Sequence, residues 1–307
     1  MTQPLDSDLR SMIRRHRRND ILFGIVGILS LLVGISTLLT LFGQLLTQGV
    51  ERLTPAFFVS FPSRFPEQAG ILSAWVGTVA VMTVTAVAAI PLGVASAIYL
   101  EEYAPKNRLT TVIEINVTNL AGVPSIVYGL LALGLFVHTL GLGQSILSAG
   151  LTLALLILPI VIVSTREALR SVPGIIREAA YALGATRWQM ISGHLLPYST
   201  GGIMTGIIMG LSRAIGETAP LVTIGALTFI AFLPHSPVTS TFPFISFQWL
   251  RDEFTVMPIQ MFNWTSRPEE EFQLNAAAAG VVLLAMTLAM NALAIWLRYR
   301  MRKKITW

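Results

Sequence analysis

The chain has 307 residues, of which 53% are hydrophobic and only 12% are charged, and its mean hydropathy is +0.68. A soluble domain carries about 25% charged residues, so this composition excludes an ordinary soluble enzyme and predicts a polytopic protein embedded in a lipid bilayer. Lys and Arg number 21 against 16 Asp and Glu, but they flank apolar runs instead of covering one soluble face, which argues against nucleic-acid binding.

The first apolar run, residues 21–46, follows a basic N-terminal segment, residues 1–20, that contains the cluster Arg14, Arg15, Arg17 and Arg18. The run is longer than the apolar region of a signal peptide, and no small-residue cleavage site follows it. We therefore expect it to remain in the protein as a membrane anchor.

Five further runs are each near or above the roughly 20 residues that a spanning helix needs. They cover residues 71–100, 123–140, 145–165, 200–233 and 275–297. The sequence thus predicts an all-α integral membrane protein with six spans in one domain, residues 21–297, and a basic tail at 298–307. Pro91, Pro159 and Pro220 fall inside these runs and mark expected kinks, because neighbouring helices can satisfy the freed carbonyls.

The positive charges predict the direction of the spans. Five Lys and Arg residues precede the first span, two lie at 106 and 108, four lie between 166 and 187, and five follow the last span. The opposite side carries Arg52, Arg64, Arg251 and Arg267. The positive-inside rule then places both termini in the cytoplasm and the loops at 47–70 and 234–274 outside. We expect Trp249 and Trp264 of the outer loops to lie at the interface or to pack over the spans.

Residues 109–120 (LTTVIEINVTNL) are less apolar than the spans and include Glu114 and Asn116. An amphipathic segment of this kind can lie in the plane of a membrane surface. We therefore expect a helix along the cytoplasmic surface before the third span.

The connection between the fourth and fifth predicted spans, residues 165–197, predicts a helical hairpin in water. Apolar residues recur at helical spacing on both sides of a glycine that stands where a helix would stop: Ile175, Ile176, Ala179, Ala180 and Leu183 before Gly184, and Trp188, Ile191 and Leu195 after it. The segment could simply connect two spans. However, roughly 30 residues is long for a connection, and an exposed apolar hairpin more often marks a partner surface.

The same hairpin resembles the EAA signature of ATP-binding-cassette importer permeases. The matching residues are Glu178, Ala179 and Ala180, then Gly184 after three intervening residues, and Leu196–Pro197 at the end. His194 departs from the family, which usually has an aliphatic residue there. The resemblance implies the type I importer permease fold and a coupling loop at about 166–198 that docks into a cytoplasmic ATPase. The implied coupling residues are Glu178, Ala179, Ala180, Gly184, Arg187 and Trp188.

The fifth predicted span carries Arg213 and Glu217, which are four residues apart and can pair on one helical face. An arginine at the centre of a membrane helix costs about 2.5–3.5 kcal/mol on insertion scales. The pair is either a structural ion pair or part of a solute pathway, and charge inside the membrane favours the pathway. Small residues at every fourth position, Gly202, Gly206, Gly210 and Ala214, are typical of helix packing. Such packing would turn Arg213 toward the bundle interior.

Four segments resemble the A-type permease of bacterial phosphate importers. They are GVPSIVYGL (122–130), RAIGETAP (213–220), PIQMFNWTSRPEEEF (258–272) and AAAAGVVLLAMTLAMNALAIWLR (276–298), and the likeness extends from about residue 72 onward. The paired C-type permease usually continues differently after RAIGET, so Ala219–Pro220 favours the A type.

This resemblance implies a permease subunit that moves inorganic phosphate across the bacterial inner membrane, with Arg213 and Glu217 in the substrate pathway. It implies three partners, namely a homologous C-type permease, an ATPase dimer and an extracytoplasmic phosphate-binding protein. The ATPase would hold ATP and Mg, and no cofactor is expected on this chain.

The sequence lacks the signatures of ATP binding, hydrolysis and metal binding. None of the three lysines follows a glycine as a phosphate-cradling loop requires, and the chain has no cysteine, no G-x-S-x-G, no H-E-x-x-H and no His pair with metal-ligand spacing. We therefore expect no catalytic residue and no metal site. A secondary transporter stays open from composition alone, although an ion-coupled carrier has no ATPase to dock. Sulfate and molybdate stay open as solutes, because Arg213 alone cannot discriminate among tetrahedral oxyanions.

Overall fold

The structure is a computed structural model that describes residues 4–238, 244 and 246–302. Every regular element of these residues is helical, which confirms the predicted all-α class. The α-helices are α1 (Pro4–Gly49), α2 (Pro55–Val59), α3 (Leu72–Ile98), α4 (Arg108–Leu120), α5 (Ser125–Ala132), α6 (Ile146–Arg170), α7 (Gly174–Ala182), α8 (Arg187–Met190), α9 (Leu196–Ile215), α10 (Ala219–Ile224), α11 (Met257–Thr265) and α12 (Glu270–Arg302). Three π-helical turns, Tyr99–Tyr103, Leu133–Thr139 and Ile191–Leu195, continue α3, α5 and α8.

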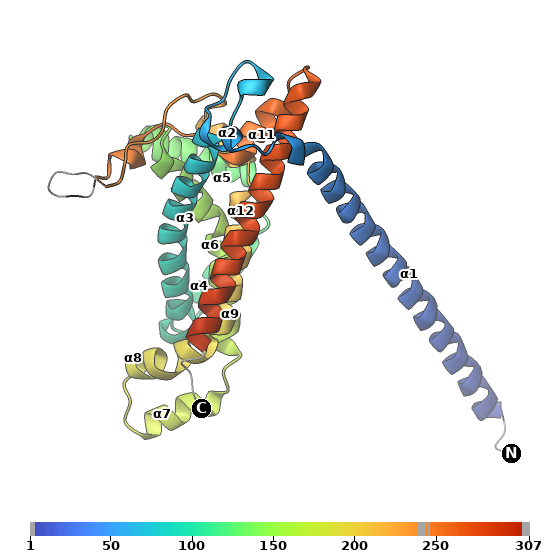
Figure 1. Cartoon of the computed structure of the whole chain (residues 1–307). Helices are drawn as coiled ribbons and strands as arrows, with labels where there is room; N and C mark the ends of the chain where they lie inside the picture. The colour runs from blue at the N-terminus through green and yellow to red at the C-terminus, as the bar shows by residue number, and fades with distance from the viewer. Residues whose placement is uncertain (1–3, 239–243, 245, 303–307) are drawn as a thin grey trace.

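A bundle of four helices, α3, α6, α9 and α12, forms the body of the molecule (Figure 1). In it α6 packs against α3 and α9, and α12 packs against α9. The core is apolar and includes Val81 of α3, Leu153 and Ile157 of α6, and Ile207 and Leu211 of α9. Because lipid tails are as apolar as these side chains, close van der Waals contact is what holds such helices together.

The small-residue stripe of α9 faces α6, as predicted for helix packing. A Cβ atom added at Gly206 would lie 2.3 Å from the Cβ of Ser164, and one added at Gly202 would lie 2.6 Å from the Cβ of Ala168. Ala214 at the end of the stripe is buried. Only glycine at position 206 allows the two backbones to approach this closely, so Gly206 fixes the distance between α6 and α9.

Four helical segments are long and apolar enough to cross a membrane, namely His16–Arg52, Leu72–Tyr103, Ile146–Arg170 and Glu270–Arg300. Helix α4 and the helix at Ser125–Thr139 are bent by 107° relative to each other. If the two form one broken span, they add a fifth crossing. The described residues therefore make a multi-pass membrane protein with four or five apolar spans, compared with the six expected.

The predicted span at 200–233 is not one helix, so its predicted extent is wrong. α9 ends at Ile215, α10 is only six residues long, and no further helix begins before Gln248 in the described part of the loop. Pro220 lies in the first turn of α10 and not in the middle of a helix. At this position its missing N–H breaks no helical hydrogen bond. Pro91 and Pro159 lie within α3 and α6 as predicted.

The helix predicted at 109–120 is confirmed as α4. Asn107 caps it, because its side-chain Oδ1 accepts a hydrogen bond of 2.9 Å from the N–H of Thr110. α4 packs against α6, yet none of its residues is buried. Its apolar residues are therefore uncovered in the isolated chain.

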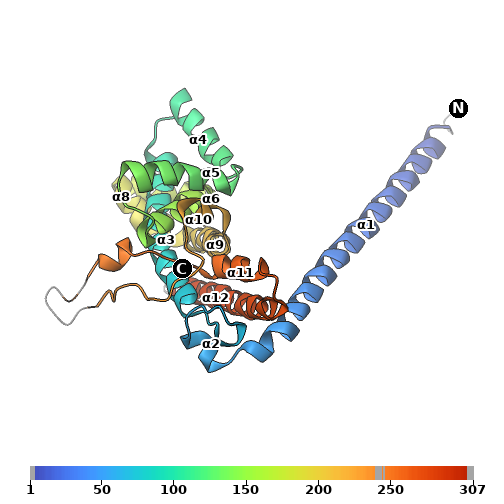
Figure 2. The ribbon, with the colours of Figure 1, turned by 90° about the horizontal axis from the view of Figure 1, so that it is seen from above.

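The first helix, α1, leaves the body as a long arm (Figure 2). It touches α12 near its C-terminal end, where a Cβ at Gly49 would lie 2.9 Å from the backbone of Ala277. No residue of its most apolar window is buried. The start of α1, the α6–α9 connection and the end of α12 all lie toward the lower end of Figure 1, so the predicted basic segments share one end of the molecule.

The segments at the opposite end fold over the bundle. Trp264 of α11 is fully buried, and its ring centroid lies 6.0 Å from that of Phe57 in α2. Trp249 is partly buried against the main core. The expected packing of these two outer-loop tryptophans over the spans is confirmed, whereas residues 239–243 and 245 of the predicted 234–274 loop lie outside the described residues.

Candidate functional site

The predicted site residues form two groups at opposite ends of α9. The α7–α8 hairpin, defined here as residues 174–195, precedes α9 at the lower end of the bundle (Figure 1). Arg213 and Glu217 lie at the other end, where α9 meets α10. The 20 residues of α9 separate the two groups, a length of about 30 Å.

The first half of the hairpin ends in a turn that requires glycine. Gly184 has a φ of +82°, its N–H donates to the carbonyl oxygen of Tyr181 at 2.9 Å, and the N–H of Ala185 donates to that of Ala180 at 3.1 Å. These two bonds form a Schellman motif, in which the residue after the helix adopts a positive φ that a side chain would strain. The turn predicted at Gly184 is confirmed.

The second half begins with a capping box. The N–H of Gln189 donates to Oγ1 of Thr186 at 3.3 Å, and the N–H of Thr186 donates to Oε1 of Gln189 at 2.8 Å. A box of this kind satisfies N–H groups that the first turn of a helix leaves free. The hairpin is therefore a defined structure and not a slack connection between two spans.

The hairpin packs against the end of α6 through a small apolar cluster of its own. Its buried members are Leu169 and Val172 before the hairpin, and Ala180, Met190, Ile191 and Leu195 within it. The predicted second amphipathic stretch is confirmed for Ile191 and Leu195. Trp188 was expected on the same face, but it points outward and is 59% exposed.

The outward face of the hairpin carries large apolar side chains with no cover. Ile175 is 72% exposed, Leu183 is 90% exposed, and Tyr181 and Trp188 are also exposed. Glu178, Ala179, Gly184 and Arg187 lie on the surface with them, whereas Ala180 is buried in the cluster. Five of the six predicted coupling residues are thus available to a partner, and the sixth holds the hairpin to the body.

Arg213 and Glu217 are held together more loosely. Arg213 lies in the last turn of α9 and Glu217 lies in the break before α10, so the pair bridges a helix end. Nε of Arg213 is 3.3 Å from Oε1 of Glu217, and the side chains are 38% and 19% exposed. Among the described residues, Glu217 is the only carboxylate that pairs with Arg213. Such a long and accessible ion pair contributes little to stability.

The expectation that Arg213 faces the bundle interior is wrong for the isolated chain. The small-residue stripe packs on α6, and Arg213 precedes Ala214 of that stripe by one residue, about 100° around the helix. Arg213 therefore shares the uncovered face of α9 with Tyr198 and Met209.

Sequence reasoning missed a cluster of acidic and basic residues beside the hairpin. Glu101 lies 2.9 Å from Nε of Arg170 and 3.4 Å from Nε of Arg166, and Glu102 lies 3.0 Å from Nη2 of Arg177. The partners are 65 to 75 positions apart, so no helical spacing links them. The available signal was two adjacent carboxylates at the end of an apolar run, on the side that the arginines make positive.

Residues 89–307 match the family described as the binding-protein-dependent transport system inner membrane component. The chain is 30% identical to the probable ABC transporter permease protein YqgI of Bacillus subtilis over 92% of this chain and 96% of that protein. It is 32% identical to the phosphate transport system permease protein PstA of Yersinia pestis over 94% of this chain and 93% of that protein.

A solved structure has a similar fold. It shows an inward-facing conformation of the MetNI methionine ABC transporter, and it superposes with a TM-score of 0.55 over 75% of this chain and 95% of that chain, at 16% identity. The helices described above therefore share the fold of an ABC importer permease.

Proposed function

The chain belongs to the family of binding-protein-dependent transport system inner membrane components, and we propose that it is the permease subunit of an ATP-driven importer of inorganic phosphate. The observation that carries the coupling to ATP is the α7–α8 hairpin, a capped structure with an uncovered apolar face. Phosphate as the solute is supported by relatives that bear the name of phosphate transport permease.

The hairpin is the proposed docking element for an ATPase dimer. Exposed apolar groups surrounded by polar ones are typical of a protein contact surface. Leu183 and Trp188 would enter a groove of the ATPase, and Glu178 and Arg187 would make polar contacts at its edge. Mg and ATP would be bound by that partner, and its closure would push on the hairpin.

The proposed topology has six crossings, with α9 as the additional one. Its 20 residues are long enough to span the hydrocarbon core of a bilayer. The hairpin and both termini would then lie in the cytoplasm of a bacterium, and the protein would lie in the inner membrane. Cysteines placed singly at Ser7 and Ser266 test this, since an impermeant thiol reagent on spheroplasts should label only the one at position 266. Labelling only at position 7 would reverse the topology.

The proposed pathway runs along the uncovered face of α9, closed by a homologous C-type permease. Arginine stays protonated inside proteins, and its planar N–H groups match a tetrahedral oxyanion. Arg213 would replace part of the water that phosphate loses, and Glu217 would weaken that grip so that the anion can leave. An extracytoplasmic phosphate-binding protein would deliver the solute.

Energy coupling tests the proposal against a secondary transporter. Cells that depend on this complex should keep importing labelled phosphate when an uncoupler collapses the membrane potential while ATP is maintained. They should stop when ATP is depleted and the potential is kept. The reverse pattern would show that the chain is an ion-coupled carrier, and the hairpin would then need another explanation.

A further inference from the structure

The π-helical turn Tyr99–Tyr103 at the end of α3 contacts three different elements through three consecutive residues. Glu101 pairs with Arg166 and Arg170 at the end of α6. Glu102 pairs with Arg177 of α7. The ring of Tyr103 lies 5.3 Å from Cζ of Arg187, which begins α8. We call this turn and its four arginines the ionic joint.

The contact of Glu102 with Arg177 is the ion pair that reaches the hairpin, and it is largely enclosed. Oε1 of Glu102 accepts from Nη2 of Arg177 at 3.0 Å and from Nε at 3.2 Å, and the side chains are 9% and 22% exposed. Arg177 also donates to the carbonyl oxygens of Leu169 and Val172, each at 2.9 Å. One guanidinium therefore ties α3, the end of α6 and α7 together, with its planar fork of donors in use.

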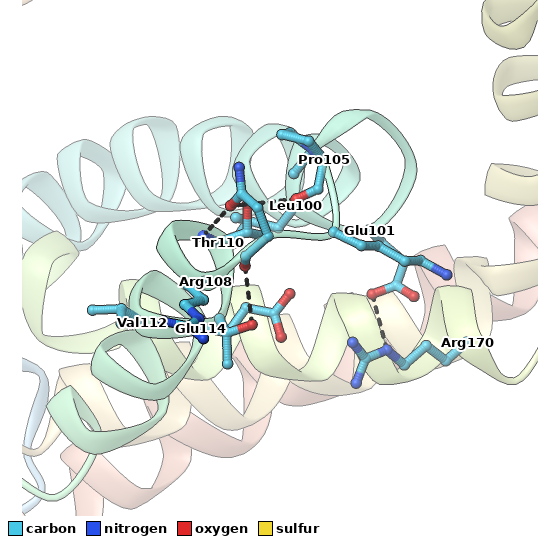
Figure 3. A pocket seen from close by; sticks show the side chains of 12 residues that line it. Leu100, Glu101, Pro105, Arg108, Thr110, Val112, Glu114 and Arg170 are labelled. Carbon is cyan, nitrogen blue, oxygen red and sulfur yellow. Dashed lines mark hydrogen bonds and ion pairs between the residues drawn. The ribbon is translucent and has the colours of Figure 1, made fainter.

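On its other side the turn borders open space. A pocket of about 760 Å³ lies between the turn and the start of α4, and Glu101 and Arg170 face each other beside it (Figure 3). α4 is connected across this region through Glu114, whose Oε1 lies 2.7 Å from Nη2 of Arg166. The turn is thus packed against the hairpin on one side and borders the pocket on the side of α4.

We propose that Glu102 is a positioning residue that transmits movement of the α7–α8 hairpin to α3. A push on α7 reaches α3 through the enclosed Glu102–Arg177 pair, and the pocket gives α3 room to respond. π-helical turns within α-helices are frequent at functional sites. The inference rests on the proposed function, because it assumes that an ATPase moves the hairpin.

The test uses the complete complex in proteoliposomes, with partner subunits that lack cysteine and a phosphate-loaded binding protein. Phosphate import and ATP hydrolysis are measured in the same vesicles. Glu102→Gln should leave the amount of bound ATPase unchanged and should lower phosphate imported per ATP by at least fivefold. Glu67→Gln, an exposed carboxylate at the other end of the molecule, should change this ratio less than twofold.

A purely structural pair predicts a different result. Glu102→Gln would then lower the amount of assembled complex and leave import per ATP unchanged, which would overturn the inference. A covalent tie gives a second test, because the chain has no cysteine of its own. The double variant Glu102→Cys with Arg177→Cys should import poorly, and a short bis-methanethiosulfonate linker should restore import. Further loss on linking would show that the pair must open, contrary to the proposal.

The experiments distinguish an error in the inferred role of the ionic joint from an error in the proposed function. If the ATPase does not bind the wild-type chain, the proposed function is wrong and the joint is wrong with it. If the ATPase binds and the wild-type complex imports, but Glu102→Gln imports equally well per ATP, only the joint is wrong. A signal from the binding protein to the ATPase would cross the hairpin in the opposite direction, from α3 to α7. Glu102→Gln should therefore also lower the stimulation of ATP hydrolysis by the binding protein.

Discussion

The two ends of α9 are built in opposite ways. At the hairpin end, polar groups have several partners at short distances, and Arg177 alone binds a carboxylate and two carbonyl oxygens. At the other end, Arg213 pairs with Glu217 across 3.3 Å, and the Arg213 side chain is 38% exposed. The first arrangement keeps the hairpin in a defined geometry, whereas the second leaves the positive charge of Arg213 accessible.

Under the proposed function, this difference suits the hairpin end to transmitting force and the Arg213 end to releasing a ligand. A lever must keep its geometry while its partner moves, so a capped hairpin tied to α6 suits it. An ion pathway must not bind its anion tightly, so a weakly paired arginine suits it better than a buried one. Three substitutions test whether the two ends differ in this way.

The largest effect is expected at Arg213. Arg213→Gln should abolish phosphate uptake while membrane abundance and ATPase assembly stay normal, because in the proposed pathway the guanidinium binds the anion and its ion pair adds little to stability. Neutralising Glu217 as well should not restore uptake. Uptake of labelled phosphate and the amount of co-purified ATPase measure both parts.

The matched control is Arg298→Gln, which removes a different arginine that contacts α9, through Oγ1 of Thr205 at 3.0 Å. It should leave uptake within twofold of wild type. If Arg213→Gln lowers the amount of protein and the double variant recovers uptake, the pair is structural and the comparison fails.

The next effect is expected at Gly184. Gly184→Leu places a side chain at a φ of +82°, which strains the turn by about 1 kcal/mol or more and disturbs the exposed face beside it. Import should fall at least fivefold while the protein still inserts in the membrane. Gly193→Leu is the control, because φ there is not positive and no atom lies near the added Cβ. Equal import by both variants would remove Gly184 from the coupling surface.

The smallest effect is expected at Glu178. The residue is exposed, and a surface ion pair is worth about 0.2–1 kcal/mol, so Glu178→Ala should weaken ATPase binding by roughly 1.4- to fivefold. Titration of the detergent-solubilised chain with purified ATPase measures this. Glu67→Ala, which removes an exposed carboxylate from the opposite end, should bind normally. An unchanged affinity in Glu178→Ala would exclude a charged contact at this position.

Local signals in the sequence predicted the hairpin well. The glycine that follows the first set of helically spaced apolar residues predicted the turn at position 184. The helical spacing of the apolar residues identified Ala180, Ile191 and Leu195 as candidates for one face. The outward direction of Trp188 could not be read from the period, because that direction depends on how the hairpin packs against α6.

Helix ends and contacts between distant parts of the chain could not be predicted from the sequence pattern. The run after Pro220 stays apolar, so hydropathy gave no sign that the helix stops at Ile215 and that α10 is only six residues long. The pairing of Glu102 with Arg177 spans 75 positions and follows from the packing of α3 beside α6. The small-residue stripe, in contrast, predicted packing correctly but not the direction of Arg213, since the stripe packs on α6 and Arg213 lies about 100° around the helix from it.

Solute uptake by the reconstituted complex shows whether phosphate is the solute and whether ATP drives its import. Proteoliposomes that contain this chain, the C-type permease and the ATPase are loaded with Mg and ATP and supplied with the binding protein and either labelled phosphate or labelled sulfate. We expect ATP-dependent accumulation of phosphate, its loss in Arg213→Gln, and no comparable uptake of sulfate. Accumulation of sulfate without phosphate, or phosphate uptake at the same rate without ATP, would contradict it.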